Sequence, residues 1–344
     1  KHVGDLTRIF LAALEARHVK PRPTLGQAFR NVFSFGREAA AQGYRLRHGR
    51  LDIVDHDTFL ENPINILKLF QEEHATGIPI HPDALRLVTA NLHLIDDRLR
   101  ACPEANRLFL DLLLSHNNPE GALRLMNEVG VLGAFIPEFG RVVAMMQFNM
   151  YHHYTVDEHI IQTISTLSKI ERGELVEALP ITTEILEKGV NRRVIYVALL
   201  LHDIGKGSGR DHSIVGAEIA ARLAPRFGLG EEDSELVVWL VRHHLLMSDT
   251  AQKRDLTDPH TARDFARVVK SPTRLRLLTV LTACDIRGVG PGVWNNWKAM
   301  LLRQNNWFRG LTARRSAAAV SARPGRSRQR GAGSGNPRPA LIWP

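Results

Sequence analysis

Cysteine and long apolar runs are both scarce in this sequence, and their scarcity excludes several classes of protein. Two cysteines, Cys102 and Cys284, in 344 residues cannot build a disulfide scaffold or a cysteine-rich zinc site. No stretch approaches the roughly 20 apolar residues that cross a membrane, and the apolar run at residues 197–201 ends at a histidine. The first residues, KHVGDLTRIF, lack a signal-peptide pattern and an initiator methionine. We therefore expect a cytoplasmic chain with reduced thiols that is a piece of a longer protein.

Aromatic residues are also few, at 6%, which favours helices that pack through Leu, Ile, Val and Ala. Hydrophobic residues make up 44% and charged residues 24%, as in an ordinary soluble globular protein. The chain is long enough to bury a sizeable core. At roughly 150 residues per domain, its length predicts about two domains.

Acidic residues are missing from residues 305–344, which carry eight arginines. The net charge of +9 therefore belongs mostly to this tail, and residues 1–304 are near +1. The Arg, Ala, Gly, Ser and Pro composition of the tail predicts disorder. We accordingly expect neither a membrane nor a nucleic acid as partner, with an RNA-binding tail as the alternative.

Apolar spacing and turn residues predict an all-α bundle with one short β-hairpin. The hairpin is expected over residues 44–54 around His48-Gly49. A break at residues 133–140, which contain Pro137, is interpreted as a domain boundary. Helices are expected over residues 5–20, from Asn62-Pro63 to before Gly77, and over 83–95, 103–114, 119–129, 155–170, 191–202, 213–227, 231–244 and 272–287. The helix from residue 155 begins with a predicted capping box, and Gly205 and Gly207 are expected to end the helix over 191–202.

His159, the pair His202-Asp203, and Asp285 stand out as candidate metal ligands. They fall on separate predicted helices, and His202-Asp203 ends one that is otherwise apolar. Such a pair is costly to bury unless something compensates its charge. Imidazole and carboxylate together suit divalent manganese, iron, zinc or cobalt, and magnesium if water completes its shell. Facing helices of a bundle can bring these side chains to one ion.

A second set of histidines, His212, His243 and His244, lies in the same part of the chain and is expected to hold a second metal. A histidine taken alone is usually packed or solvated, so the joint pattern carries this prediction. Lys206 follows His202 in a glycine-rich turn and is expected to clamp a phosphate oxygen. A solvated loop lysine is the alternative.

The motif HDIGKG at residues 202–207, with His159 upstream and Asp285 downstream, resembles the HD superfamily of metal-dependent phosphohydrolases. Longer stretches resemble the family of bifunctional PII uridylyltransferase/uridylyl-removing enzymes over about residues 1–304. They include FNMYHHYTVDEH, VALLLHDIGKGSGRDHS, VRHHLLMS and LTACDIRGVGPGVWNNWKAMLLRQ, and in the first half KHVGDLTRIFLAALE, NPINILKLFQ and IHPDALRLV.

This resemblance implies a division of the chain into four parts. Residues 1–60 would be the end of a nucleotidyltransferase region, 61–140 a helical linker and 141–304 the HD phosphohydrolase domain, followed by the tail over 305–344. The glycine-serine turn and paired aspartates of the transferase core are not found before residue 60, and the match stops after Gln304, before any ACT domain. We therefore expect no uridylyl transfer, and a truncation or frameshift is our hypothesis for the tail.

The resemblance also implies a reaction, the hydrolysis of the uridylyl–tyrosine phosphodiester on the PII signal protein to UMP and free PII. Manganese or magnesium is the expected cofactor, with iron, cobalt and zinc as alternatives. Asp203 and Lys206 are expected at the reacting phosphate, and one of His212, His243 and His244 would protonate the phenolate, whose acid has a pKa of about 10. Three alternatives stay open: another HD-type nucleotide phosphohydrolase, an inactive fragment that binds PII or nucleotide, and an RNA-binding tail.

Overall fold

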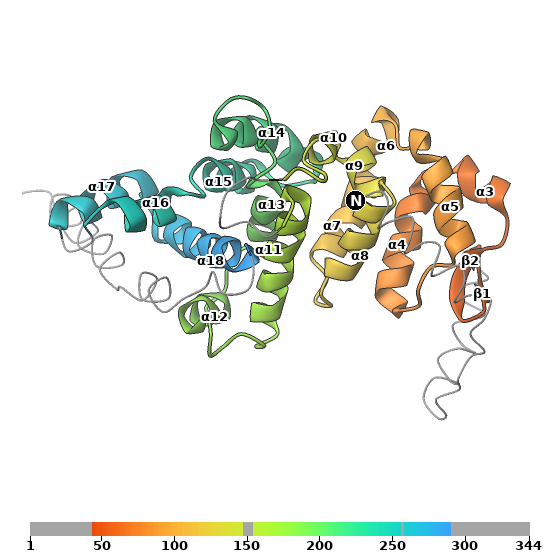
Figure 1. The fold of residues 1–344 in the computed structure, drawn as a ribbon, viewed down its shortest axis with the longest axis horizontal. Helices are drawn as coiled ribbons and strands as arrows, with labels where there is room; N and C mark the ends of the chain where they lie inside the picture. Colours follow the sequence, from red (N-terminus) through yellow and green to blue (C-terminus); the bar gives the residue numbers. More distant parts are fainter. Residues whose placement is uncertain (1–42, 147–153, 256–257, 290–344) are drawn as a thin grey trace, which may run out of the picture.

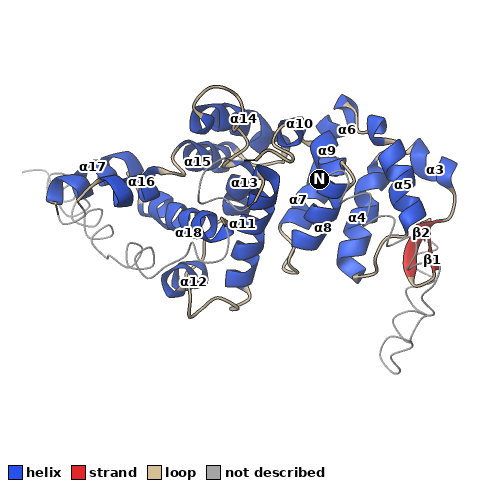
Figure 2. Ribbon diagram, in the orientation of Figure 1, coloured by secondary structure: helices blue, strands red, loops and turns tan. Residues whose placement is uncertain are grey.

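The computed structural model describes residues 43–146, 154–255 and 258–289, and these form helices with a single two-stranded hairpin (Figure 2). The predicted all-α class is confirmed. The helix expected over residues 5–20, the motif residues 148–153 and 290–304, and the tail over 305–344 lie outside the described residues.

The hairpin lies where the sequence predicts it. Strands β1 (Tyr44–Arg47) and β2 (Arg50–Ile53) pair antiparallel, with Tyr44 opposite Ile53. His48 and Gly49 join them with φ of 52° and 73°, the left-handed pair that a two-residue hairpin turn of type I′ requires. The turn residues therefore set the register that puts the side chain of Ile53 into the core.

The first group of helices follows the hairpin and occupies one end of the elongated molecule (Figure 1). It consists of α3 (His56–Glu61), α4 (Ile64–Thr76), α5 (Pro82–Ala90), the 3-10 turn η1 (Leu92–Leu94), α6 (Asp97–Ala101), α7 (Pro103–Leu113), α8 (Glu120–Glu128), α9 (Val131–Phe135) and α10 (Pro137–Gly140). Prolines stand at the first position of α5, α7 and α10, where the absent N–H leaves no hydrogen bond unmade.

The second group of helices occupies the other end (Figure 1). It consists of α11 (Val156–Glu171), α12 (Pro180–Glu187), α13 (Arg192–Leu201), α14 (His212–Arg226), α15 (Glu231–Arg242), α16 (Leu246–Lys253), α17 (Pro259–Val269) and α18 (Pro272–Gly288). Helix α13 is buried along most of its length and packs against α11, α14, α15 and α18. It is the central helix of this group.

Two local predictions are wrong. Residues 133–140 are no open break, because α9 and α10 meet there so closely that a Cβ on Gly133 would lie 3.0 Å from the Cα of Gly140. The capping box is also absent, since the Thr155 side chain makes no capping hydrogen bond. Glu158, its expected partner, is paired with Arg124 of α8 instead. In both places a contact between helices overrides the local signal.

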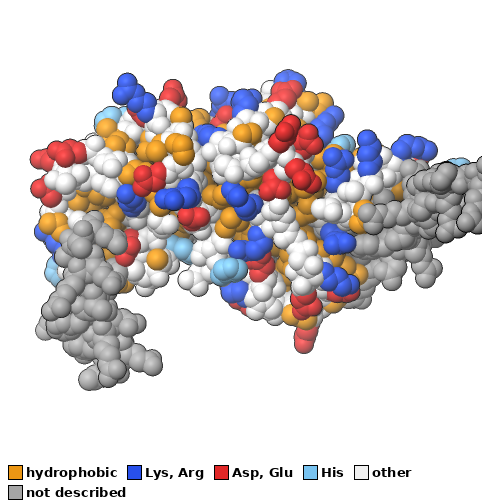
Figure 3. Space-filling model, turned by 180° about the vertical axis from the view of Figure 1, so that it is seen from behind, with side chains coloured by type: hydrophobic (Ala, Val, Ile, Leu, Met, Phe, Trp, Pro, Cys, Tyr) orange, Lys and Arg blue, Asp and Glu red, His pale blue; other side chains and the backbone are white. Residues whose placement is uncertain are grey.

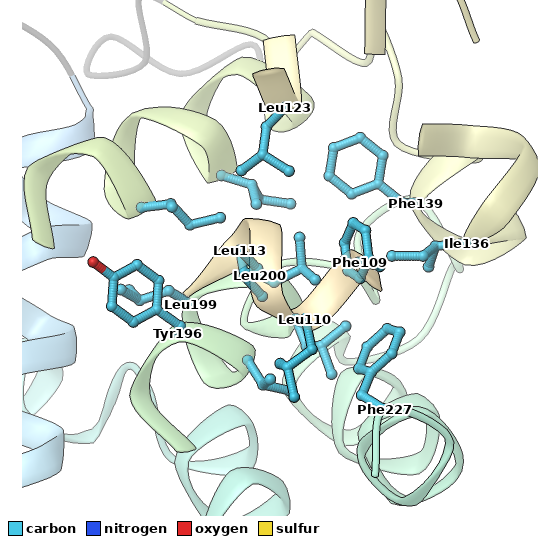
Figure 4. Packing of buried hydrophobic residues seen from close by; sticks show 14 of the residues in the cluster. Phe109, Leu110, Leu113, Leu123, Ile136, Phe139, Tyr196, Leu199, Leu200 and Phe227 are labelled. Atoms are coloured by element: carbon cyan, nitrogen blue, oxygen red, sulfur yellow. The ribbon is translucent and has the colours of Figure 1, made fainter. Parts of the chain in front are cut away.

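The core is a single apolar cluster that runs through both groups of helices. Phe109 of α7 lies at their meeting point, with ring centroids 5.4 Å from Phe135 and 5.5 Å from Phe227. Figure 4 shows it beside Phe139 of α10, with Leu199 and Leu200 of α13 nearby. The core thus crosses the predicted boundary at residues 133–140.

The surface of the described residues mixes charges of both signs, and Figure 3 shows them interspersed over one face of the molecule. This agrees with the small net charge of residues 1–304. No helix in the described ranges is long and apolar enough to cross a membrane.

Candidate metal centre

Five different helices bring the candidate ligands together. His159 lies in the second turn of α11 and Asp285 near the end of α18, while His202 and Asp203 follow the last turn of α13. His212 begins α14 and His244 follows α15 by two residues. The four helices α11, α14, α15 and α18 all pack on α13, and this packing makes the chain's distant residues converge.

The first group of ligand atoms surrounds the Nε2 atom of His159. This nitrogen lies 2.9 Å from Oδ1 of Asp285, 3.2 Å from Nε2 of His202 and 3.6 Å from Oδ2 of Asp203. The other ring nitrogen of His202, Nδ1, lies 2.7 Å from the backbone oxygen of Leu199. A hydrogen bond there fixes the ring and turns Nε2 toward the group, as in histidines that bind metals.

The second group shares Asp203 with the first. Its Oδ1 atom lies 3.8 Å from Nε2 of His212 and 3.7 Å from Nε2 of His244, while Oδ2 faces the first group. The Nδ1 atom of His244 lies 2.8 Å from the backbone oxygen of Val241, which orients this ring in the same way. Asp203 therefore stands between two pairs of histidines, His159 with His202 and His212 with His244, and each pair together with Asp203 is compact enough for one ion.

Lys206 meets the same carboxylate, with its Nζ atom 2.6 Å from Oδ2 of Asp203. The lysine side chain is 18% exposed, whereas that of Asp203 is 3% exposed. The predicted alternative of a solvated loop lysine therefore does not describe its position. Lys206 lies between the buried carboxylate and the surface.

Neighbouring charges keep the carboxylates of the centre ionised. Burial raises the pKa of Asp203, but His202 and Lys206 reverse the effect and hold the pKa below its usual value. Burial raises the pKa of Asp285 too, but hydrogen bonds from His159 and His202 outweigh this effect. The pKa of Asp285 is therefore well below its usual value. Burial lowers the pKa of His244. Burial also lowers the pKa of His202, but Asp203 and Asp285 more than offset this and leave its pKa raised. Ionised carboxylate and neutral imidazole are the forms that bind divalent cations.

The residues present fit a divalent metal. The Nε2 atom of His244 is buried and has no hydrogen-bond partner, although it points toward Asp203. Buried polar atoms are normally satisfied, so an orphaned imidazole nitrogen beside a carboxylate indicates a missing electron-pair acceptor. The mixture of imidazole and carboxylate donors suits manganese, iron, cobalt or zinc, as well as magnesium with water.

Two glycines allow the backbone approaches that assemble the centre. A Cβ on Gly205 would lie 2.3 Å from the backbone oxygen of His212, so only glycine lets the turn after Asp203 reach the start of α14. A Cβ on Gly288 would lie 2.6 Å from Cγ2 of Thr163 and would separate α18 from α11. The sequence showed Gly205 only as a helix terminator, and it carried no sign of the role of Gly288.

Asp157 is a buried polar residue that the sequence analysis missed. Its carboxylate accepts hydrogen bonds from Nδ2 of Asn127, at 2.8 Å, and from the backbone N–H of Ala144, at 3.0 Å. It thereby ties α8 and the segment after α10 to the start of α11, two residues from His159. Its position in the first turn of a helix made it look like an ordinary capping acid.

Of the candidate ligands, His243 lies apart from the centre. Asp285 is outside the two compact sets, but its Oδ1 atom contacts Nε2 of His159. The ring of His243 lies against Trp239, with centroids 5.0 Å apart, and lines a separate cavity between α14 and α15. The physical reason is that adjacent residues after the end of α15 project in different directions, so His244 and His243 cannot serve the same site.

Two family models match separate parts of the chain. Residues 156–284 match the family model of the HD domain, and residues 44–135 match that of the uridylyltransferase GlnD third domain. The HD match contains His159, His202, Asp203, His212 and His244, and it ends one residue before Asp285. These matches confirm the resemblance that the motifs indicate.

Similar proteins carry the same double name. The chain is 64% identical over 301 residues to a bifunctional uridylyltransferase/uridylyl-removing enzyme of Ruegeria pomeroyi. The aligned residues make up 88% of this chain and 33% of that protein. Proteins of the same name from Cereibacter sphaeroides and Azospirillum brasilense are 64% and 53% identical, again over 88% of this chain and 32% of theirs. The chain spans about a third of the length of these relatives.

Proposed function

We propose that this chain catalyses metal-dependent hydrolysis of a phosphodiester, and specifically that it removes UMP from the uridylylated PII signal protein in the cytoplasm. The observation that carries the proposal is the convergence of four histidines and Asp285 around Asp203, from five helices or the residues that directly follow them. The names of the similar proteins, which include uridylyl removal, favour this substrate over other phosphodiesters.

The proposed ligands form two sets that share one carboxylate. His159, His202, Asp203 and Asp285 would hold one divalent cation, manganese or magnesium, and His212 and His244 would hold a second with Asp203. A bound divalent cation supplies positive charge that polarises a phosphoryl oxygen and acidifies water.

The chain's own side chains would neutralise charge on the phosphate and supply a proton to the leaving group. Lys206 would neutralise charge on the phosphoryl oxygens, since its ammonium group lies at the edge of the buried carboxylate. His212, whose side chain is 27% exposed, would deliver a proton to the departing tyrosine phenolate only if it does not hold the second ion. Burial lowers the pKa of His212, which favours the neutral imidazole that can bind a metal.

The direct test is the release of UMP from uridylylated PII by the purified chain with manganese, with and without a chelator. Release that stops with the chelator and is absent in Asp203→Asn is the expected result. A folded chain that binds metal but leaves uridylylated PII intact would overturn the substrate, and a nucleotide panel would then test the alternative of another HD-type phosphohydrolase. Release that continues in the chelator would overturn the metal mechanism.

A further inference from the structure

Three arginines line another cavity, of about 750 Å³, where α7 meets the start of α13 and the end of α14. They are Arg107, Arg193 and Arg226. The cavity shares no lining residue with the candidate metal centre. One wall belongs to the third-domain match and the other to the HD match, so it lies at the junction of the two regions. Ligand pockets form preferentially at such junctions, and this volume lies within their usual range.

Within the part of the chain that the structure describes, this cavity carries an excess of positive charge. Neither Arg107 nor Arg193 nor Arg226 has a carboxylate within ion-pair distance among the described residues. Arg193 donates instead to the backbone oxygen of Gly228, at 2.9 Å. Asp111 is the only acidic residue of the lining, which leaves an excess of two positive charges around the space.

Arg226 shows most clearly that a partner is missing. Its guanidinium carbon lies 5.0 Å from the ring centres of both Phe135 and Phe227, and its one hydrogen bond runs from Nη2 to the backbone oxygen of Phe135, at 3.1 Å. The Nε atom is buried without any acceptor. Burial lowers the pKa of Arg226 to about 10, which reflects the cost of holding this charge in an apolar setting. An anion in the cavity would recover part of that cost.

The rest of the lining is suited to the nucleoside part of a ligand. The Oδ1 atom of Asn106 is buried and has no hydrogen-bond donor, while its Nδ2 atom already donates to the backbone oxygens of Arg100 and Cys102. With the carboxylate of Asp111, it offers acceptors for hydroxyl or amino groups. Leu110 and Phe227, both visible in Figure 4, add apolar surface against which a base can pack.

We propose that this cavity binds a nucleoside phosphate, with the phosphate on the three arginines and the nucleoside toward Asn106 and Asp111. One guanidinium group can donate two hydrogen bonds to a phosphate at once, which gives both affinity and a fixed orientation. A ligand here would contact both regions of the chain at once and would hold them together. The site is independent of the proposed hydrolysis, and its failure would leave that function untouched.

The test measures ATP binding to the full 344-residue chain by calorimetry in EDTA, so that metal-dependent binding is removed. The double variant Arg107→Ala/Arg193→Ala takes two exposed side chains from the cavity. The matched control, Arg98→Ala/Arg263→Ala, removes two exposed arginines that line neither cavity and have no ion-pair partner among the described residues. The arginine-rich tail is the same in both variants. We expect the first to weaken ATP binding about 10-fold or more and the second to change it less than about 2-fold.

Equal weakening in the two variants, or no weakening in the first, would overturn the proposal. Adenosine and inorganic tripolyphosphate separate the two halves of the ligand, and each is expected to bind at least about 10-fold more weakly than ATP. Tripolyphosphate that binds as tightly as ATP would overturn the nucleoside assignment. The single variant Arg107→Glu, with a charge reversed on an exposed helix face, repeats the test if the double variant has a lower melting temperature.

Discussion

Asp52 in the hairpin and Asp203 after α13 are both buried carboxylates, 1% and 2% exposed, yet their surroundings differ. Asp52 is paired with Arg45, a neighbour on the adjacent strand, through two hydrogen bonds of 3.0 and 2.8 Å. Asp203 is surrounded by imidazoles from α11, α14 and the end of α15, and by Lys206. Arg47 of the same strand as Arg45 lies 3.8 Å from the Asp52 carboxylate. A buried charge whose ion-pair partners lie on the adjacent strand supports the fold, whereas one that collects groups from several elements marks a site.

The same contrast holds for the two regions as a whole. In the first region His81 is buried as the N-cap of α5, where its Nδ1 atom accepts from the backbone N–H of Asp83. In the second region His159, His202 and His244 are buried facing other ionisable groups. Burial of a histidine therefore does not distinguish a ligand from a cap, and the identity of its neighbours does.

The largest expected effect comes from removing the Asp203 carboxylate, with removal of the Asp52 carboxylate as the comparison. Asp203→Ala should remove bound metal and lower UMP release more than about 10²-fold, because it takes a shared carboxylate from both ligand groups. Asp52→Ala should leave catalysis unchanged and lower the free energy of unfolding by about 1–3 kcal/mol, since Arg45 loses its partner. Metal content, UMP release and urea denaturation measure the three effects. An Asp203→Ala variant that keeps its metal would contradict the assignment.

Two adjacent histidines provide the next comparison. His244→Ala should lower the rate of UMP release about 10- to 100-fold and weaken metal binding, because it removes a nitrogen that faces Asp203. His243→Ala should change the rate less than about 2-fold, since this ring packs on Trp239 outside the centre. Titration of metal into both variants, followed by rate measurements, checks the pair. Similar losses in the two variants would show that His243 reaches the site.

Two glycines extend the comparison to the backbone. Gly205→Ala should destabilise the chain by about 1–3 kcal/mol and displace the start of α14, because the new Cβ would meet the backbone oxygen of His212 at 2.3 Å. Gly121→Ala in α8 has open space around its Cβ and should stabilise by about 0.5–1 kcal/mol. Chemical denaturation measures both. If Gly205→Ala were as stable as the unaltered chain, the close approach at α14 would be wrong.

The smallest expected effect concerns Glu120, which joins the two regions across α8 and α11. Burial raises the pKa of Glu120, but hydrogen bonds from Ser165 and Arg124 more than reverse this and leave the pKa lowered. The stability it contributes is therefore complete above the unfolded pKa of about 4.3 and is lost as the pH falls through the lower folded pKa. Because Glu120 is partly exposed, the contribution is about 0.5 kcal/mol.

Urea denaturation between pH 3 and pH 7 tests this coupling. The stability difference between the unaltered chain and Glu120→Gln should be largest near neutral pH and should shrink below pH 4. Glu184→Gln provides the control, since Glu184 is 60% exposed and, among the described residues, pairs with Lys188 alone, in the next turn of its helix. A difference for Glu120→Gln that does not depend on pH would show that its carboxylate charge contributes nothing to the junction.

Local signals were sufficient for much of the fold. The glycine at residue 77 ends α4 in a left-handed conformation, and Asn191 caps α13 through a hydrogen bond to the backbone N–H of Val194, as their residue types lead one to expect. The same signals failed at Thr155, because Glu158 pairs with Arg124, which is distant in the sequence. They also failed at residues 133–140, because α9 and α10 pack closely against each other there.

The sequence by itself determined the all-α class, the hairpin turn, most of the helices and the residue types of the candidate centre, because these depend on neighbours a few positions away. Only the tertiary structure decided which histidines meet Asp203, since His243 and His244 differ by one position and point apart. It also decided that Arg107, Arg193 and Arg226 line one cavity. Convergence of side chains far apart in the chain follows from helix packing, which spacing along a sequence does not encode.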